Sequence, residues 1–179
     1  MSAPRSTHTA ADGIRFAFGT LTALPVRVTR WDRDAARAGM LAAPLAGLVV
    51  GLCAAAVGGL LLLAGAGALL AAVATTAVPP VLTRGLHLDG LADTADGLGS
   101  AKPAEDALRI MKRSDIGPFG VITLLLVLLA QVAALTELYD EGWAYGAVAA
   151  AGLRTVTDVV TGLDIGDTVV RTSVLERVA

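Results

Sequence analysis

The run AAPLAGLVVGLCAAAVGGLLLL, residues 42–63, decides how this chain can fold. It is uncharged throughout, and a helix of about 22 residues, rising 1.5 Å per residue, crosses a hydrocarbon core of roughly 30 Å. The composition agrees, since 55% of the 179 residues are hydrophobic, only 17% are charged and the mean hydropathy is +0.68. We therefore expect an all-α fold, a polytopic integral membrane helical bundle.

A second apolar run follows closely. The GAG at 65–67 permits a tight reversal, and residues 68–82 then continue without charge. Pro79 and Pro80 are expected to end or kink this helix near its exit. The runs 42–63 and 68–82 are thus predicted to form a helical hairpin.

A third span is predicted at residues 118–134, where Pro118 suits the first helical turn. A fourth apolar stretch, near 143–160, is marginal because it contains an arginine. Aromatic residues expected to mark a membrane interface follow the third span: Tyr139, Trp143 and Tyr145.

Composition divides the chain into a cytoplasmic or interfacial N-terminal segment, a membrane domain and an atypical polar tail. Their bounds are 1–40, 41–153 and 154–179, and the membrane domain includes one strongly charged segment, 83–117. Six arginines precede the first span and five lysines or arginines lie in the charged segment. Under the positive-inside rule, both basic segments face the cytoplasm. No cleavable signal peptide is expected.

Charge and cysteine content exclude several classes. The net charge of -2 shows no basic excess of the kind that nucleic-acid binding requires. Cys53 is the single cysteine, so the chain has no intrachain disulfide and no cysteine metal cluster. We expect Cys53 to be a small buried apolar residue.

The charged segment contains RGLHLDGLADTADGLGS, residues 84–100. If this stretch is helical, Asp89, Asp93 and Asp96 stand at i, i+4 and i+7 and share one face, where like charges repel. Mg²⁺ relieves such repulsion, because it prefers oxygen ligands and commonly joins one or two carboxylates to a substrate phosphate. The alternative is a solvated loop with no chemistry. The aspartate spacing alone does not decide between the two, and the basic cluster that follows it favours the Mg²⁺ site.

A second cluster, RIMKRSDIGPFG at 109–120, brings cations and a hydroxyl to the start of the third span. Such groups bind phosphate oxygens, although each basic residue has interface anchoring as its alternative. His87, two residues before Asp89, is a candidate general base, a donor to phosphate, or an interfacial side chain with no chemistry.

Taken together, GLHLDGLADTADGLGS (85–100) and RIMKRSDIGPFGV (109–121) resemble cobalamin synthase, the adenosylcobinamide-GDP ribazoletransferase family. FAFGTLTALPV (16–26) also resembles that family's N-terminal segment. The resemblance implies a Mg²⁺-dependent inner-membrane enzyme that joins adenosylcobinamide-GDP to α-ribazole or its 5'-phosphate and releases GMP, in the last steps of cobalamin biosynthesis. The implied partners are these substrates and the lipid bilayer. Short apolar spans with small residues are compatible with a homo-oligomer but do not establish one.

The resemblance also implies roles for particular residues. The three aspartates hold Mg²⁺, and one of them, or His87, accepts the proton of the attacking ribazole 3'-hydroxyl. The substrate-binding candidates are Arg84, Lys112 and Ser114. Family members often have an acidic residue after that lysine and a basic one after the serine. This chain has Arg113 and Asp115 there, so neither is assigned a role.

Two rivals compete with this reading. The signature of CDP-alcohol phosphotransferases opens D-G-x-x-A-R, whereas DGLADT has Asp93 and Thr94 where alanine and arginine would fall. A non-catalytic cation-binding membrane protein is disfavoured, because ion pathways tend to place acids within spans. The family pattern ends near Arg154, before several expected apolar helices, so we expect a truncated, frameshifted or divergent short form.

Overall fold

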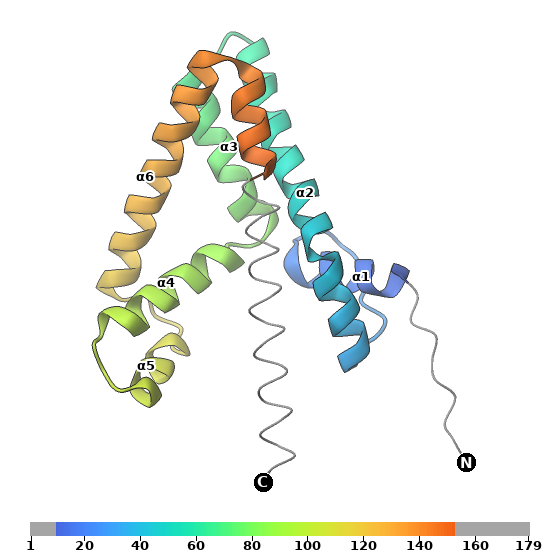
Figure 1. Cartoon of the computed structure of the whole chain (residues 1–179), viewed down its shortest axis with the longest axis vertical. Helices are drawn as coiled ribbons and strands as arrows, with labels where there is room; N and C mark the ends of the chain where they lie inside the picture. The colour runs from blue at the N-terminus through green and yellow to red at the C-terminus, as the bar shows by residue number, and fades with distance from the viewer. Residues whose placement is uncertain (1–9, 153–179) are drawn as a thin grey trace. The chain divides into compact units, whose positions relative to one another are not determined.

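The computed structural model describes residues 10–152, and its regular elements there are all helices. They are α1 (Ala10–Leu21), α2 (Arg33–Leu63), α3 (Ala68–Leu82), α4 (Leu86–Gly99), α5 (Ala104–Met111) and α6 (Pro118–Glu141), drawn in Figure 1. Residues 143–152 are helical as well. The predicted all-α class is confirmed for this part of the chain. The predicted polar tail, 154–179, lies outside the described residues.

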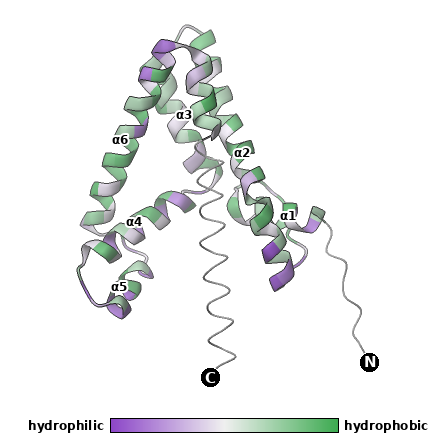
Figure 2. Ribbon diagram, in the orientation of Figure 1, coloured by the Kyte–Doolittle hydropathy of each residue, from purple (hydrophilic) through white to green (hydrophobic). Residues whose placement is uncertain are grey.

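Two helices are long and apolar enough to cross a membrane by themselves, α2 with 31 residues and α6 with 24. The remaining predicted span, residues 68–82, is α3, which has only 15 residues. It reaches spanning length only together with α4, from which it is bent by 89°. Two of the three predicted spans are therefore long enough alone, and the third is half of a bent pair. In Figure 2, α6 is mostly green, the colour of hydrophobic residues.

The helical hairpin has the predicted bounds at its second helix. α2 ends at Leu63, Gly65 takes a left-handed conformation with φ of 86°, and α3 starts three residues after that glycine. Pro79 and Pro80 lie inside α3, in its last turn, and the helix ends two residues later at Leu82. The prolines thus stand at the exit of the helix, where the loss of their N–H groups affects only the last turns.

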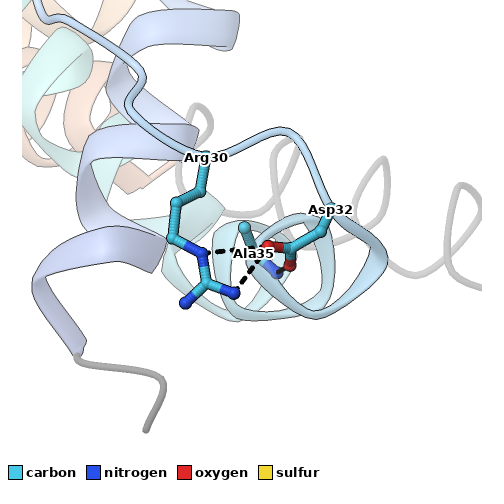
Figure 3. Close-up of polar contacts among 3 residues, drawn as sticks. All are labelled: Arg30, Asp32 and Ala35. Carbon is cyan, nitrogen blue, oxygen red and sulfur yellow. Dashed lines mark hydrogen bonds and ion pairs between the residues drawn. The ribbon is translucent and has the colours of Figure 1, made fainter. Parts of the chain in front are cut away.

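The chain forms two compact units, divided after Cys53, and the second comprises Ala54–Ala150. In the first unit, α2 begins at a side-chain cap, shown in Figure 3. Asp32 accepts the N–H of Ala35 at 2.8 Å through Oδ1 and two N–H groups of Arg30 at 2.9 and 2.6 Å through Oδ2. The cap satisfies one of the donors that a helix leaves open at its start.

α2 buries its small residues and exposes its large ones. Between residues 43 and 54 the buried residues follow one stripe: Ala43, Ala46, Gly47, Val50, Gly51 and Ala54. The exposed leucines follow another: Leu41, Leu45, Leu48, Leu52, Leu60 and Leu63. This arrangement suits a helix in lipid, where close packing uses small side chains and leucine meets the hydrocarbon. Cys53 lies beside Leu52 and is exposed, so the expectation that it is buried is wrong.

The second unit has a small core where α2, α3 and α6 meet. Ala71, Ala72 and Tyr139 form its centre, and the hydroxyl groups of Thr75 and Tyr139 share a buried hydrogen bond of 2.8 Å. Gly58 of α2 lies against both hydroxyls and leaves no room for a Cβ. Tyr139, predicted to mark a membrane interface, is therefore a core residue, while Trp143 and Tyr145 are exposed.

Candidate functional site

The aspartate motif is helical and forms α4, so the condition for a shared face of the three aspartates is met. Gly85 precedes the helix in a left-handed conformation with φ of 72°. The three carboxylates differ in exposure along the shared face. Asp89 is exposed, Asp93 is half-buried and Asp96 is buried, with 7% of its surface exposed. In Figure 1, α4 runs from the end of α3 to the start of α6, so the buried end of the motif meets the start of a spanning helix.

Asp96 binds the first turn of α6 directly. Its Oδ2 accepts the N–H of Gly117 at 2.6 Å, and its Oδ1 accepts the N–H of Gly120 at 2.8 Å. Both bonds join a carboxylate to backbone donors at a helix N-terminus, where the helix dipole also favours negative charge. The aspartate motif and the GPFG sequence are thus joined through one side chain.

Asp93 lies one turn before Asp96, and α4 is outside the two helices that span by themselves. The pKa of Asp93 is raised above its ordinary value. Burial of the carboxylate contributes most, and the negative charges of Asp89 and Asp96 add to it. A cation at this face would offset the part of the pKa increase that comes from the repulsion.

A cleft of about 310 Å³ opens beside Asp93 and Asp96 in the second unit. It lies between the end of α4, α5 and the start of α6. Its lining is Asp93, Asp96, Ser100, Lys102, Ile110, Arg113, Asp115, Gly117, Pro118 and Phe119. Its lining contains both carboxylates and cations, the groups that a phosphate and its counter-ion need.

Lys102 and Arg113 supply the positive charge of this cleft. Lys102 is exposed in the connection between α4 and α5, and Arg113 lies just after α5. The Arg113 Nε donates to Asp115 Oδ1 at 3.0 Å, and both side chains are 64% exposed. An exposed pair of this kind adds little stability, so Arg113 is available to a ligand at small cost.

The structure does not bring all the predicted site residues to the cleft. Only Asp93 and Asp96 of the predicted set line it. The predicted residues that do not line it are Arg84, His87, Asp89, Lys112 and Ser114. His87 lies in the first turn of α4 with both ring nitrogens shielded from solvent, and helical geometry places it roughly 120° around α4 from Asp93.

Sequence reasoning missed several lining residues. Ser100 ends the quoted motif and Lys102 lies two residues after it, and their position next to the aspartate helix was the available signal. Arg113 and Asp115 were left without a role because they depart from the family pattern, yet both reach the cleft. The neighbouring Lys112 and Ser114 are exposed outside it.

Among residues 10–152, no group of three or more His, Cys, Asp or Glu side chains is close enough to hold a metal ion together. A site with fewer protein ligands agrees with the chemistry of Mg²⁺, which often keeps several waters and uses one or two carboxylates. Asp89 and Asp93, one helical turn apart on one face, are the pair whose oxygens are not engaged at α6.

These features define a class: an all-helical membrane protein in which an acidic helix, α4, and the cations Lys102 and Arg113 lie at the start of a spanning helix, α6. The chain belongs to the cobalamin-5-phosphate synthase family, whose sequence profile matches residues 13–163. The match includes both the aspartate motif and the start of α6.

Curated relatives agree with this assignment. An adenosylcobinamide-GDP ribazoletransferase of a Nocardioides species is 45% identical over 138 residues, which is 76% of this chain and 60% of the relative. Proteins of the same name from Frankia casuarinae and Brevibacillus brevis are 46% and 38% identical, over 68% and 71% of this chain and 47% and 51% of their own lengths. The chain thus spans about half to three-fifths of these relatives. No solved structure matches it.

Proposed function

We propose that this chain acts as an adenosylcobinamide-GDP ribazoletransferase, the activity for which its relatives are named. It would join adenosylcobinamide-GDP to α-ribazole or α-ribazole 5'-phosphate, giving adenosylcobalamin or its 5'-phosphate and GMP. The observation that carries the proposal is the cleft, whose lining includes the carboxylates of Asp93 and Asp96 and the cations of Lys102 and Arg113. A bound pyrophosphate needs cations to neutralise its charge and carboxylates to hold its metal counter-ion.

The proposed reaction is a transfer of a phosphoryl group to an alcohol. The ribazole 3'-hydroxyl attacks the phosphorus attached to the cobinamide aminopropanol, a new P–O bond forms, and the bond from that phosphorus to GMP breaks. The hydroxyl proton passes to a carboxylate or to His87. Asp93 is the best placed of the proposed bases. Asp89 and His87 do not line the cleft, and both oxygens of Asp96, which does line it, accept hydrogen bonds from α6.

The basic residues would neutralise and orient the phosphates. Lys102, just before α5, and Arg113, just after it, both line the cleft. Together they can hold a pyrophosphate while GMP departs. Arg84, Lys112 and Ser114 are exposed and remain proposed contacts for parts of the substrates outside the cleft. In phosphoryl transfer, such positioning and charge neutralisation provide most of the acceleration.

Asp89 and Asp93 fit Mg²⁺ as a two-carboxylate site. Both oxygens of Asp96, the third predicted ligand, are already hydrogen-bonded at α6. When bound, Mg²⁺ would stabilise the charge of the pyrophosphate and of the departing GMP. The protein's own part is to hold the two carboxylates on one helical face beside the cleft.

The proposed location is a bacterial inner membrane, with the cleft on the cytoplasmic side. Basic residues before α2 and around α5 support this orientation under the positive-inside rule. The soluble substrates would then reach the cleft from the compartment where nucleotides are present.

The test uses the full chain in lipid nanodiscs with adenosylcobinamide-GDP, α-ribazole 5'-phosphate and Mg²⁺, and follows GMP and the corrinoid product. We expect turnover that EDTA abolishes and that Asp93→Asn lowers by about 100-fold or more. Arg113→Gln should lower it by roughly tenfold or more. Arg109→Gln is the matched control, because Arg109 is exposed on α5 and pairs with Glu105 and Asp106 outside the cleft.

A folded chain that binds Mg²⁺ without forming GMP would contradict the proposal for this chain. The non-catalytic cation-binding alternative would then be favoured, or the activity would need segments that only the longer relatives contain. Turnover that survives Asp93→Asn would contradict the assignment of the site.

A further inference from the structure

We propose that Asp96 is a positioning residue, which caps α6 and holds the start of that helix against α4, and is not a third ligand of Mg²⁺. The inference deepens the proposed function. Its metal part rests on that function, whereas the cap stands on the contacts of Asp96 alone.

The backbone donors at the start of α6 carry the argument. Gly117 is the N-cap and has no side chain that could cap the helix, and Pro118 at the first helical position has no N–H. The donors that remain open are the N–H groups of Gly117, Phe119 and Gly120. Asp96 accepts two of these three, at 2.6 and 2.8 Å.

The glycines around the carboxylate support the same role. A Cβ at either Gly117 or Gly120 would overlap with the Asp96 carboxylate. Gly120 is buried, and its Cβ would also press on the Ala92 carbonyl of α4. The carboxylate reaches both N–H groups because both positions are glycine, which explains the two glycines of GPFG in structural terms.

Burial separates Asp96 from the other two aspartates. Its side chain is enclosed where α4 meets α6, and it is compensated there by two charge-assisted hydrogen bonds and the positive end of a helix of 24 residues. Gly117, Pro118 and Phe119 line the same cleft as Asp93. By fixing them, Asp96 sets the distance between the acidic face of α4 and the opposite wall.

The experiment compares the full chain with Asp96→Asn, Gly120→Ala and Asp93→Asn in nanodiscs. It measures amide hydrogen exchange of a peptide spanning residues 116–121, thermal unfolding without metal, and binding of Mn²⁺, used as the probe for Mg²⁺, by electron paramagnetic resonance. Exchange of a peptide from α5 serves as the internal control.

We expect Asp96→Asn to speed exchange at 116–121 by about tenfold and to lower Tm by roughly 4–8 °C. An asparagine can accept only one of the two bonds and turns an N–H donor toward the other. Its Mn²⁺ affinity should stay within about threefold of the parent chain. Asp93→Asn should show the reverse, a Mn²⁺ affinity lower by about tenfold or more with unchanged exchange at 116–121.

Gly120→Ala keeps all three carboxylates and should also speed exchange at 116–121 and lower Tm. If Asp96→Asn fails to fold, Gly120→Ala alone tests whether the contact with Asp96 holds the start of α6. Unchanged exchange at 116–121 in Gly120→Ala would overturn the proposal. A loss of Mn²⁺ affinity in Asp96→Asn beyond that in Gly120→Ala would also overturn it, because Asp96 would then be a ligand. If the parent chain binds no Mn²⁺, the proposed metal site fails, and exchange and Tm alone judge the cap.

Discussion

At the scale of single residues, the three aspartates of α4 have different surroundings. Asp93 is the one whose pKa is raised, by burial first and then by Asp89 and Asp96. Because the folded-state pKa exceeds the unfolded one, ionised Asp93 destabilises the metal-free fold above that pKa. We predict that Asp93→Asn raises the metal-free Tm at neutral pH by about 1–2 °C. The gain should vanish below about pH 4, where the carboxyl is protonated in both states.

Thermal unfolding followed by circular dichroism over a pH series measures this effect. Asp106→Asn is the control, because Asp106 pairs with Arg109 on the exposed surface of α5, and it should show no gain. A lower Tm for Asp93→Asn at neutral pH without metal would mean that ionised Asp93 stabilises the fold. That result would contradict its raised pKa.

At the scale of helices, the buried bond between Thr75 and Tyr139 joins α3 to α6. The two residues are 64 positions apart, and their hydroxyls are 2.8 Å apart. Tyr139→Phe should lower the free energy of unfolding by about 1 kcal/mol, since it leaves a buried hydroxyl without this partner. The corresponding fall in Tm is about 2–4 °C.

A double-mutant cycle with Thr75→Val tests whether the bond itself is responsible. The double variant should lose less than the sum of the two single losses, because it removes both polar partners. Tyr145→Phe, at an exposed tyrosine, should leave Tm unchanged. Strictly additive losses would show that the two hydroxyls act independently.

At the scale of the whole molecule, the positive-inside rule predicts the sides of the membrane. The side of each position can be measured by placing single cysteines in a Cys53→Ser background and labelling them with a membrane-impermeant maleimide. Thr29→Cys and Ala104→Cys should react several-fold faster in inverted vesicles than in spheroplasts, and Asp140→Cys should react faster in spheroplasts. All three positions are exposed in the structure. Labelling of Ala104→Cys in spheroplasts would place the cleft on the other side.

Much of this protein can be predicted from local sequence. The uncharged run at 42–63 predicts a spanning helix inside α2, and the bounds of α3 follow from the GAG turn and the run after it. The i, i+4, i+7 spacing correctly predicts that the aspartates share one face of a helix. These results depend on hydropathy and helical period, which act over a few neighbouring residues.

The sequence by itself therefore determined the three apolar helices and the shared helical face of the aspartates, while the Mg²⁺ chemistry of the motif stays a prediction. Only the tertiary structure decided which groups each charged residue meets. Asp96 acts through backbone donors 21 and 24 positions away, and Arg113, not Lys112, reaches the cleft because the chain turns after α5. The physical reason is distance along the chain: a helical pattern predicts which face a side chain occupies, but which groups meet that face depends on how separate helices pack.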